Sequence, residues 1–99
     1  MQYAFADNDA TVTLSGELTF VDHPVFRAMA TRLMQAKAAA SVIDLSGLEF
    51  IDSAGLGMLL VARDEAKRGN RKLVLRRPTG QVKRMLDISK FETLFSIQQ

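Results

Sequence analysis

The stretch that most constrains the fold is residues 50–60, FIDSAGLGMLL. A short, mostly apolar run at 41–45 precedes it, as expected of a strand that is covered on both faces. An apolar block at 54–68 follows it and has the length and period of a helix. An acid, a hydroxyl and two glycines stand between the two, so Ser53 is expected where a strand passes into a helix.

The remaining residues alternate short strand-like and longer helix-like segments. Residues 2–6 and 10–15 predict an antiparallel hairpin around the turn residues 7–9, and residues 16–20 then lead away from the sheet. Asp22 and Pro24 mark the start of a first helix, and 78–89 predict a third. Residues 46–51 read as a connector. Further strands are predicted at 72–75 and 94–97.

The resulting order is β-β-α-β-α-β-α-β. Alternating strands and helices need crossover connections, so the sheet is expected to be mixed and mostly parallel. No repeat, linker or low-complexity tract interrupts the chain. The sequence therefore predicts a single α/β domain over residues 1–99, with helices packed on the sheet.

The amino-acid composition argues against several kinds of functional site. The chain has no cysteine and one histidine, so disulfides and thiolate metal sites are excluded, and a zinc site or a catalytic triad has little support. No run reaches the ~20 apolar residues of a membrane span, and the N-terminus does not resemble a signal peptide. We therefore expect a cytoplasmic protein that is not an enzyme and has no metal or cofactor.

Basic residues concentrate in the C-terminal third, where they raise the question of nucleic-acid binding. No aromatic residues interleave with them and no recognition motif is present, so a solvated basic face without nucleic acid is the default expectation. The six residues are Arg71, Lys72, Arg76, Arg77, Lys83 and Arg84.

Ser53 has two interpretations. The start of a helix has unpaired backbone N–H groups and partial positive charge, which suit a phosphoryl group. Gly55 and Gly57 would keep the first turn thin for an approaching protein, and a phosphate would add roughly −1.5 to −2 charges beside Asp52 and Glu49. In the simpler alternative, Asp52 or Ser53 is only the residue that caps the helix.

The second helix is apolar over more of its circumference than one buried face requires. A helical projection predicts that Leu56, Leu60 and Val61 lie toward its charged side. They form either a docking patch for a partner or a surface covered by neighbouring helices. The predicted sheet-packing face consists of Gly55, Met58, Leu59, Ala62, Ala66 and Gly69.

The string DSAGLG at 52–57, after an apolar strand, resembles the STAS domain family, which includes bacterial anti-sigma factor antagonists. Residues 16–18, 69–75, 78–86 and 91–97 also fit the layout of that family. The resemblance implies a mixed sheet with helices packed on it. It implies that a partner serine kinase of the GHKL ATPase type, often also the anti-sigma factor, phosphorylates Ser53, and that a PP2C-type phosphatase reverses this.

The resemblance thus implies partner switching in bacterial signal transduction, in which the unmodified domain binds and the phosphoprotein is released. Antagonists of the family carry an acid directly after Gly-x-Leu, where this chain has Thr19, and Asp22 is the carboxylate that could replace it. Two alternatives stay open: a non-phosphorylated accessory subunit of a transport or other complex, and a nucleic-acid binder. The predicted partner-binding residues are Asp52, Ala54, Gly55, Leu56, Gly57, Leu60, Val61 and Asp22.

Overall fold

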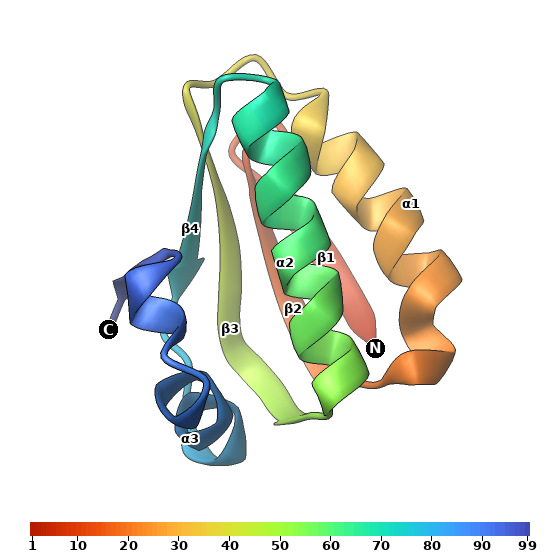
Figure 1. Ribbon diagram of the computed structural model, residues 1–99. Helices are drawn as coiled ribbons and strands as arrows, with labels where there is room; N and C mark the ends of the chain where they lie inside the picture. The colour runs from red at the N-terminus through yellow and green to blue at the C-terminus, as the bar shows by residue number, and fades with distance from the viewer.

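Five strands form one mixed sheet in the order β1-β2-β3-β4-β5. The computed structural model describes residues 1–99 and confirms the predicted α/β fold class. Figure 1 shows α1 and α2 side by side across one face of the sheet, with α3 beside the end of β3 where the chain enters α2. The strands are β1 Gln2–Ala6, β2 Thr11–Leu18, β3 Ala40–Ile51, β4 Lys72–Arg76 and β5 Ser96–Gln98. The helices are α1 His23–Met34, α2 Ser53–Arg68 and α3 Gly80–Ile88, with 3-10 turns η1 Phe20–Asp22 and η2 Phe91–Thr93.

Strand pairing decides which segments meet at the edge of the sheet. β1 and β2 are antiparallel, whereas β2, β3, β4 and β5 pair in parallel. Parallel strands bring their carboxyl ends to one edge, and here Leu18 of β2 lies opposite Ile51 of β3. The segment that follows β2, residues 19–22, is therefore held beside the start of α2.

The core lies between the sheet and the helices. Alternate strand residues such as Leu14, Ile43 and Leu75 point into it, as the two-residue period of a strand requires. Met29 and Leu33 of α1 meet them from the helical layer and have no exposed surface. None of the helices has the length and apolar character that crossing a membrane requires.

Two segments that the sequence predicts as loops are strand. β3 continues without a break through residues 46–51, and β2 includes residues 16–18. Ser46-Gly47 reads locally as a turn, but the pairing of β2 with β3 absorbs it through register shifts near Ser15 and Gly16. Gly47 suits this irregular pairing because a Cβ there would lie 2.9 Å from the Leu14 carbonyl oxygen.

The ends of other elements also differ from prediction. α3 spans Gly80–Ile88, so it begins later and ends earlier than the predicted range 78–89. The last strand lies at Ser96–Gln98 rather than at the predicted 94–97, and the 3-10 turn η2 precedes it. These differences leave the predicted order of elements unchanged.

Candidate functional site

Asp52 is the residue that caps α2. Its backbone is extended, with φ −101° and ψ −179°. Its Oδ1 accepts a 2.8 Å hydrogen bond from the Gly55 amide, and its Oδ2 accepts one of 3.2 Å from the Phe20 amide. The capping role left open between Asp52 and Ser53 therefore belongs to Asp52, which also ties the start of η1 to the start of α2.

Ser53 is the first residue of α2, and its side chain is exposed. None of the hydrogen bonds of the cap uses its hydroxyl. The Gly55 amide is taken by the Asp52 side chain, and the Leu56 amide donates to the Asp52 carbonyl over 3.0 Å. The amides of Ser53 and Ala54 have no acceptor within the helix, as expected for its first turn. A free hydroxyl thus lies beside two free donors.

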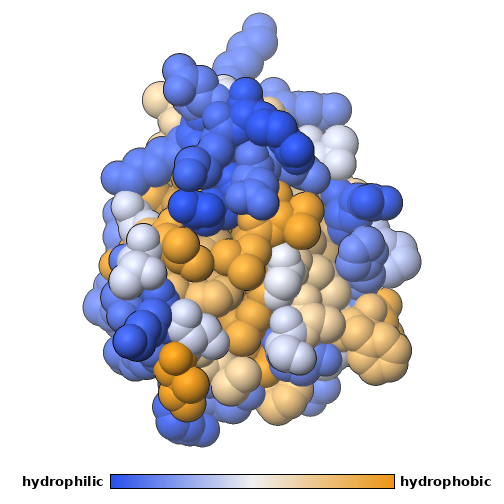
Figure 2. Space-filling model, in the orientation of Figure 1, coloured by the Kyte–Doolittle hydropathy of each residue, from blue (hydrophilic) through white to orange (hydrophobic).

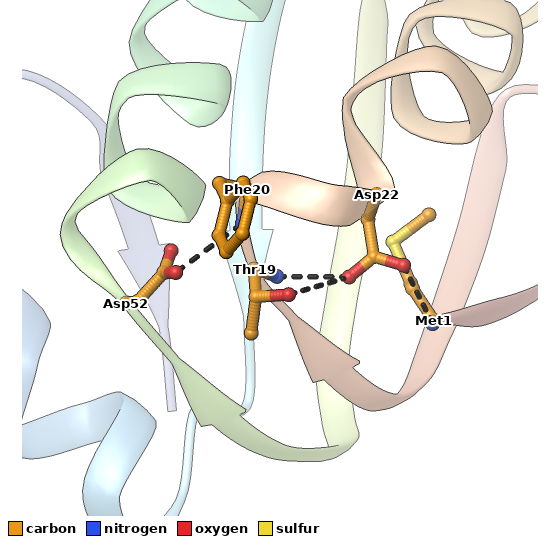
Figure 3. Close-up of polar contacts among 5 residues, drawn as sticks. All are labelled: Met1, Thr19, Phe20, Asp22 and Asp52. Atoms are coloured by element: carbon orange, nitrogen blue, oxygen red, sulfur yellow. Dashed lines mark hydrogen bonds and ion pairs between the residues drawn. The ribbon is translucent and has the colours of Figure 1, made fainter.

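Asp22 does not reach this site. Its Oδ2 accepts from the Thr19 amide over 2.8 Å and from the Thr19 hydroxyl over 3.4 Å, while Oδ1 accepts from the Met1 ammonium over 3.0 Å. The Thr19 amide, above all, holds the pKa of Asp22 below its usual value. Figure 3 shows Asp22 and Asp52 on opposite sides of Thr19 and Phe20, with Asp22 turned toward Met1.

Two expectations for Asp22 are therefore corrected. The residue stands at the position before α1, but its side chain makes no capping hydrogen bond to that helix. Both of its oxygens are engaged by Thr19 and Met1, so the expected carboxylate is turned toward Met1 and makes no hydrogen bond to Ser53. Tertiary contacts of Met1, rather than local helix chemistry, decide where this carboxylate points.

Large apolar side chains are exposed around the start of α2. Phe20 is 71% exposed and Val21 is 66% exposed in η1, and Phe50 of β3 is also exposed. The Asp52–Phe20 hydrogen bond holds η1 against this end of the sheet. The sequence prediction missed these three residues, although Phe20 and Val21 stand in a segment with no predicted burial face. Exposed apolar surface of this kind suits protein contact.

A groove of about 310 Å³ runs between α1 and α2. Phe26 and Met58 line its buried floor. Gly57 lies on its open side, where a Cβ would meet no atom within 4 Å. Arg27 and His23 border it from α1, where His23 is exposed. Figure 2 shows hydrophobic surface over the N-terminal half of α2 and hydrophilic surface over its C-terminal half.

The predicted partner-binding residues fall into two groups. Ala54, Gly57 and Val61 line the groove, and Val61 is exposed as predicted. Gly55 and Leu56 are buried, and Leu56 is only 8% exposed. The prediction that Leu56 lies on the charged side is therefore wrong, because Leu56 belongs to the buried core.

Leu60 is half-buried against the core. The predicted packing face of α2 is confirmed from Gly55 to Ala66, whereas Gly69 lies beyond the helix and is exposed. No group of three His, Asp or Glu side chains is arranged to hold a metal ion.

Most of the six basic residues in the C-terminal third have partners within the protein. Arg76 and Arg77 pair with Asp44, and Lys83 pairs with Asp87. Arg71 donates to backbone carbonyls at the end of α1. The basic third is therefore not one continuous solvated face. This arrangement weakens the nucleic-acid interpretation of these residues.

Comparison with known proteins agrees with this architecture. A family model described as "Mlab, STAS domain" matches residues 1–97. A STAS-domain containing protein of Pseudomonas aeruginosa (strain UCBPP-PA14) is 35% identical over 89 residues, which cover 90% of this chain and 87% of the relative. The chain belongs to the STAS domain family.

Solved structures of anti-sigma factor antagonists share the fold. One from Mycobacterium paratuberculosis is 26% identical, with a TM-score of 0.78 over 98% of this chain and 84% of that chain. SpoIIAA in its unphosphorylated form is 22% identical, with a TM-score of 0.70 over 99% of this chain and 86% of that chain. The latter similarity supports the fold rather than a shared activity.

The division of roles between Asp52 and Ser53 predicts a difference in stability. Asp52→Ala removes the cap and the bond to Phe20, so it is expected to lower the free energy of unfolding by about 1–2 kcal/mol. Ser53→Ala is expected to change it by less than about 0.5 kcal/mol, as for other surface positions. Urea denaturation of the two variants checks this, and equal losses would contradict the assignment of the cap.

Proposed function

We propose that the protein is a phosphorylation-controlled protein-binding switch of the anti-sigma factor antagonist type, with Ser53 as the modified residue. The observation that carries the proposal is the exposed hydroxyl of Ser53. This hydroxyl is free because Asp52, and not Ser53, caps α2. The proposed modifying enzymes are a serine kinase of the GHKL ATPase type and a PP2C-type phosphatase. In this scheme the domain is their substrate and not itself a catalyst.

The unmodified state presents a surface that suits a protein partner. Phe20, Val21 and Phe50 are exposed next to Ser53, and the groove between α1 and α2 continues from Ala54 to Val61. A partner covering this region buries apolar area, which contributes about 25 cal/mol per Å² to association before the costs of binding. The same approach brings the partner over the Ser53 hydroxyl.

A phosphate on Ser53 is well tolerated by the free protein. The amides of Ser53 and Ala54 and the positive end of the α2 dipole favour an anion there, by about 0.3–1 kcal/mol for the dipole. In the complex, the same dianion lies under apolar partner surface and beside the Asp52 carboxylate, where desolvation and repulsion oppose it. Phosphorylation is therefore expected to weaken the complex without unfolding the domain.

Co-expression with the GHKL-type kinase of the same genome tests the proposal. Mass spectrometry is expected to find one phosphate on Ser53 and none on the Ser53→Ala protein. Ser53→Asp is expected to weaken binding to that kinase at least tenfold, about 1.4 kcal/mol, while Ser53→Ala retains it. Ser89→Asp, an equal charge change at an exposed position outside the site, serves as the matched control.

The opposite results are equally clear. Absence of phosphate together with equal binding by Ser53→Asp and Ser53→Ala would remove the switch. Tight binding of a partner that neither substitution alters would instead support the non-phosphorylated accessory subunit.

A further inference from the structure

The two rims of the groove between α1 and α2 each carry a charged side chain that has no ion pair. Arg27 is exposed on the α1 rim, and Glu65 is half-buried on the α2 rim. All ion pairs of the protein join other residues, and Arg63 and Asp64 beside Glu65 pair with each other. Charges of opposite sign are therefore free to meet complementary charges of a partner at the two rims.

The two rim charges lie at different distances from Ser53. Figure 1 shows that α1 and α2 begin at the same end of the molecule and run in the same direction. Arg27 lies about one turn into α1, whereas Glu65 lies about three turns into α2. The positive charge is therefore nearer to Ser53, and the negative charge is roughly 12 Å further along the groove.

The groove has a closed apolar floor and an open side. Phe26 of α1 and Met58 and Ala62 of α2 are buried in its floor, whereas Val61 at its margin is 54% exposed. A small ligand in such a groove would keep much of its surface in water, although typical ligand pockets bury about 70–90% of a ligand. The groove therefore suits a segment of a protein whose outer face can remain in solvent or contact other parts of that protein.

The walls of the groove favour a helix over an extended segment. Both walls are α-helices, so their backbone groups are already hydrogen-bonded within each helix. An extended segment would find no strand edge to pair with, and its own N–H and C=O groups would be buried without partners. A helix satisfies these groups internally and presents an apolar stripe at positions i, i+3 or i+4, and i+7.

We propose that the groove receives one amphipathic helix of the partner protein, with an acidic residue against Arg27 and a basic residue against Glu65. These two residues of the partner helix lie about two turns apart, and the apolar stripe between them fills the groove. The acidic residue is at the end nearer to Ser53, so the rim charges fix the direction of the helix. The inference rests on the proposed function, because it specifies the partner segment for the same surface.

Binding of the GHKL-type kinase of the same genome, measured by calorimetry, tests the groove. Gly57→Leu places a larger side chain where a Cβ meets no atom within 4 Å, so it is expected to fill the groove and to weaken binding at least tenfold. Arg27→Glu and Glu65→Lys are each expected to weaken binding about tenfold, because each places like charges opposite each other. Circular dichroism of each variant separates loss of binding from loss of folding.

Matched controls make the same charge changes outside the groove. Lys37→Glu and Glu92→Lys alter exposed residues that have no ion pair, and both are expected to stay within threefold of wild type. Equal losses in the controls and in the groove variants would overturn the inference, because they would show only an effect of net charge.

Hydrogen exchange of the kinase identifies the segment that enters the groove. Wild type is expected to protect a kinase helix with the stated apolar stripe and charges, and Gly57→Leu is expected to lose that protection. Protection of an extended segment instead would overturn the inference. A dimer of the protein alone that Gly57→Leu dissociates would also overturn it, since the groove would then belong to a second copy of the chain.

The variants at Ser53 distinguish this inference from the proposed switch. If Ser53→Asp weakens binding and the groove variants do not, the helix is overturned and the switch remains. If the groove variants weaken binding while Ser53 carries no phosphate and Ser53→Asp has no effect, the helix remains and the switch is removed. No binding of the kinase by the wild type would overturn both.

Discussion

Gly55→Ala is expected to lower the free energy of unfolding by about 2 kcal/mol, although alanine is the better helix former. A Cβ at this position would lie 2.6 Å from Ile51 Cγ1 and 2.6 Å from the Leu18 carbonyl oxygen. That oxygen belongs to the backbone and accepts a 3.2 Å hydrogen bond from the Asp52 amide. Overpacking against such a group costs about 1–3 kcal/mol, which outweighs the propensity gain of up to about 1 kcal/mol.

Gly57→Ala provides the matched control, one half-turn further along the same helix. Its Cβ would meet no atom within 4 Å. Only the helix propensity then changes, so this variant is expected to be more stable than wild type by about 0.5–1 kcal/mol. Urea denaturation of both variants, with equal m-values, measures the two effects. Changes of the same sign would contradict the packing argument.

The expected changes of opposite sign distinguish two glycines that lie two residues apart at the start of α2. Both were predicted to keep the first turn of the helix thin for an approaching protein. Gly55 also belongs to the predicted sheet-packing face, and in the structure it allows α2 to pack closely on the end of β2. Gly57 alone faces the groove that a partner can reach. The helical period already places Gly55, and not Gly57, on the packing face. The position of β2 shows how closely Gly55 packs there.

Local patterns were sufficient to predict the order of elements and the position of Ser53. The apolar run before Asp52 and the apolar helix after it define the junction without any knowledge of the rest of the chain. The packing face of α2 follows equally from its helical period. These features depend on interactions between residues that are close in sequence.

Features set by distant residues were not predictable in the same way. Turn-like residues at 46–47 were read as the end of a strand, because their pairing with β2 lies some thirty residues away. The direction of the Asp22 side chain depends on Met1, and the backbone of Phe20 is held by Asp52, 32 residues further along the chain. Leu56 was misplaced because a helical projection does not show which neighbours cover the first turn of α2.

Asp44 is a second feature that only the tertiary structure explains. The residue is 1% exposed on β3. Its Oδ2 accepts from Arg76 Nε over 3.0 Å and from Arg77 Nη2 over 2.6 Å, and its Oδ1 accepts from the Ser46 amide over 2.8 Å. Burial by itself raises the pKa of this carboxyl, but the hydrogen bonds from Arg77, Ser46 and Arg76 together hold it well below its usual value.

Asp44→Asn is expected to destabilise the protein by about 3 kcal/mol at pH 7. The substitution keeps the shape of the side chain but removes the charge that the two guanidinium groups require, and the loss of a charged hydrogen-bond acceptor costs about 1.5–3 kcal/mol per bond. Removing one partner of a buried ion pair generally destabilises a protein by about 3–5 kcal/mol. We expect the lower end of this range for Asp44→Asn, because water can still solvate the partly exposed Arg76 and Arg77. Thermal and urea unfolding of the variant measure the loss.

The pH dependence identifies the ionised carboxylate as the source of this stability. The folded-state pKa lies below the unfolded-state value of 3.8, so the contribution is complete above about pH 5 and is lost as the pH falls toward the folded-state pKa. The difference in unfolding free energy between wild type and Asp44→Asn should therefore shrink progressively below about pH 4. Asp64→Asn, at an exposed pair, should differ from wild type by less than about 0.5 kcal/mol throughout. A gap for Asp44→Asn that is independent of pH would instead assign the loss to altered packing.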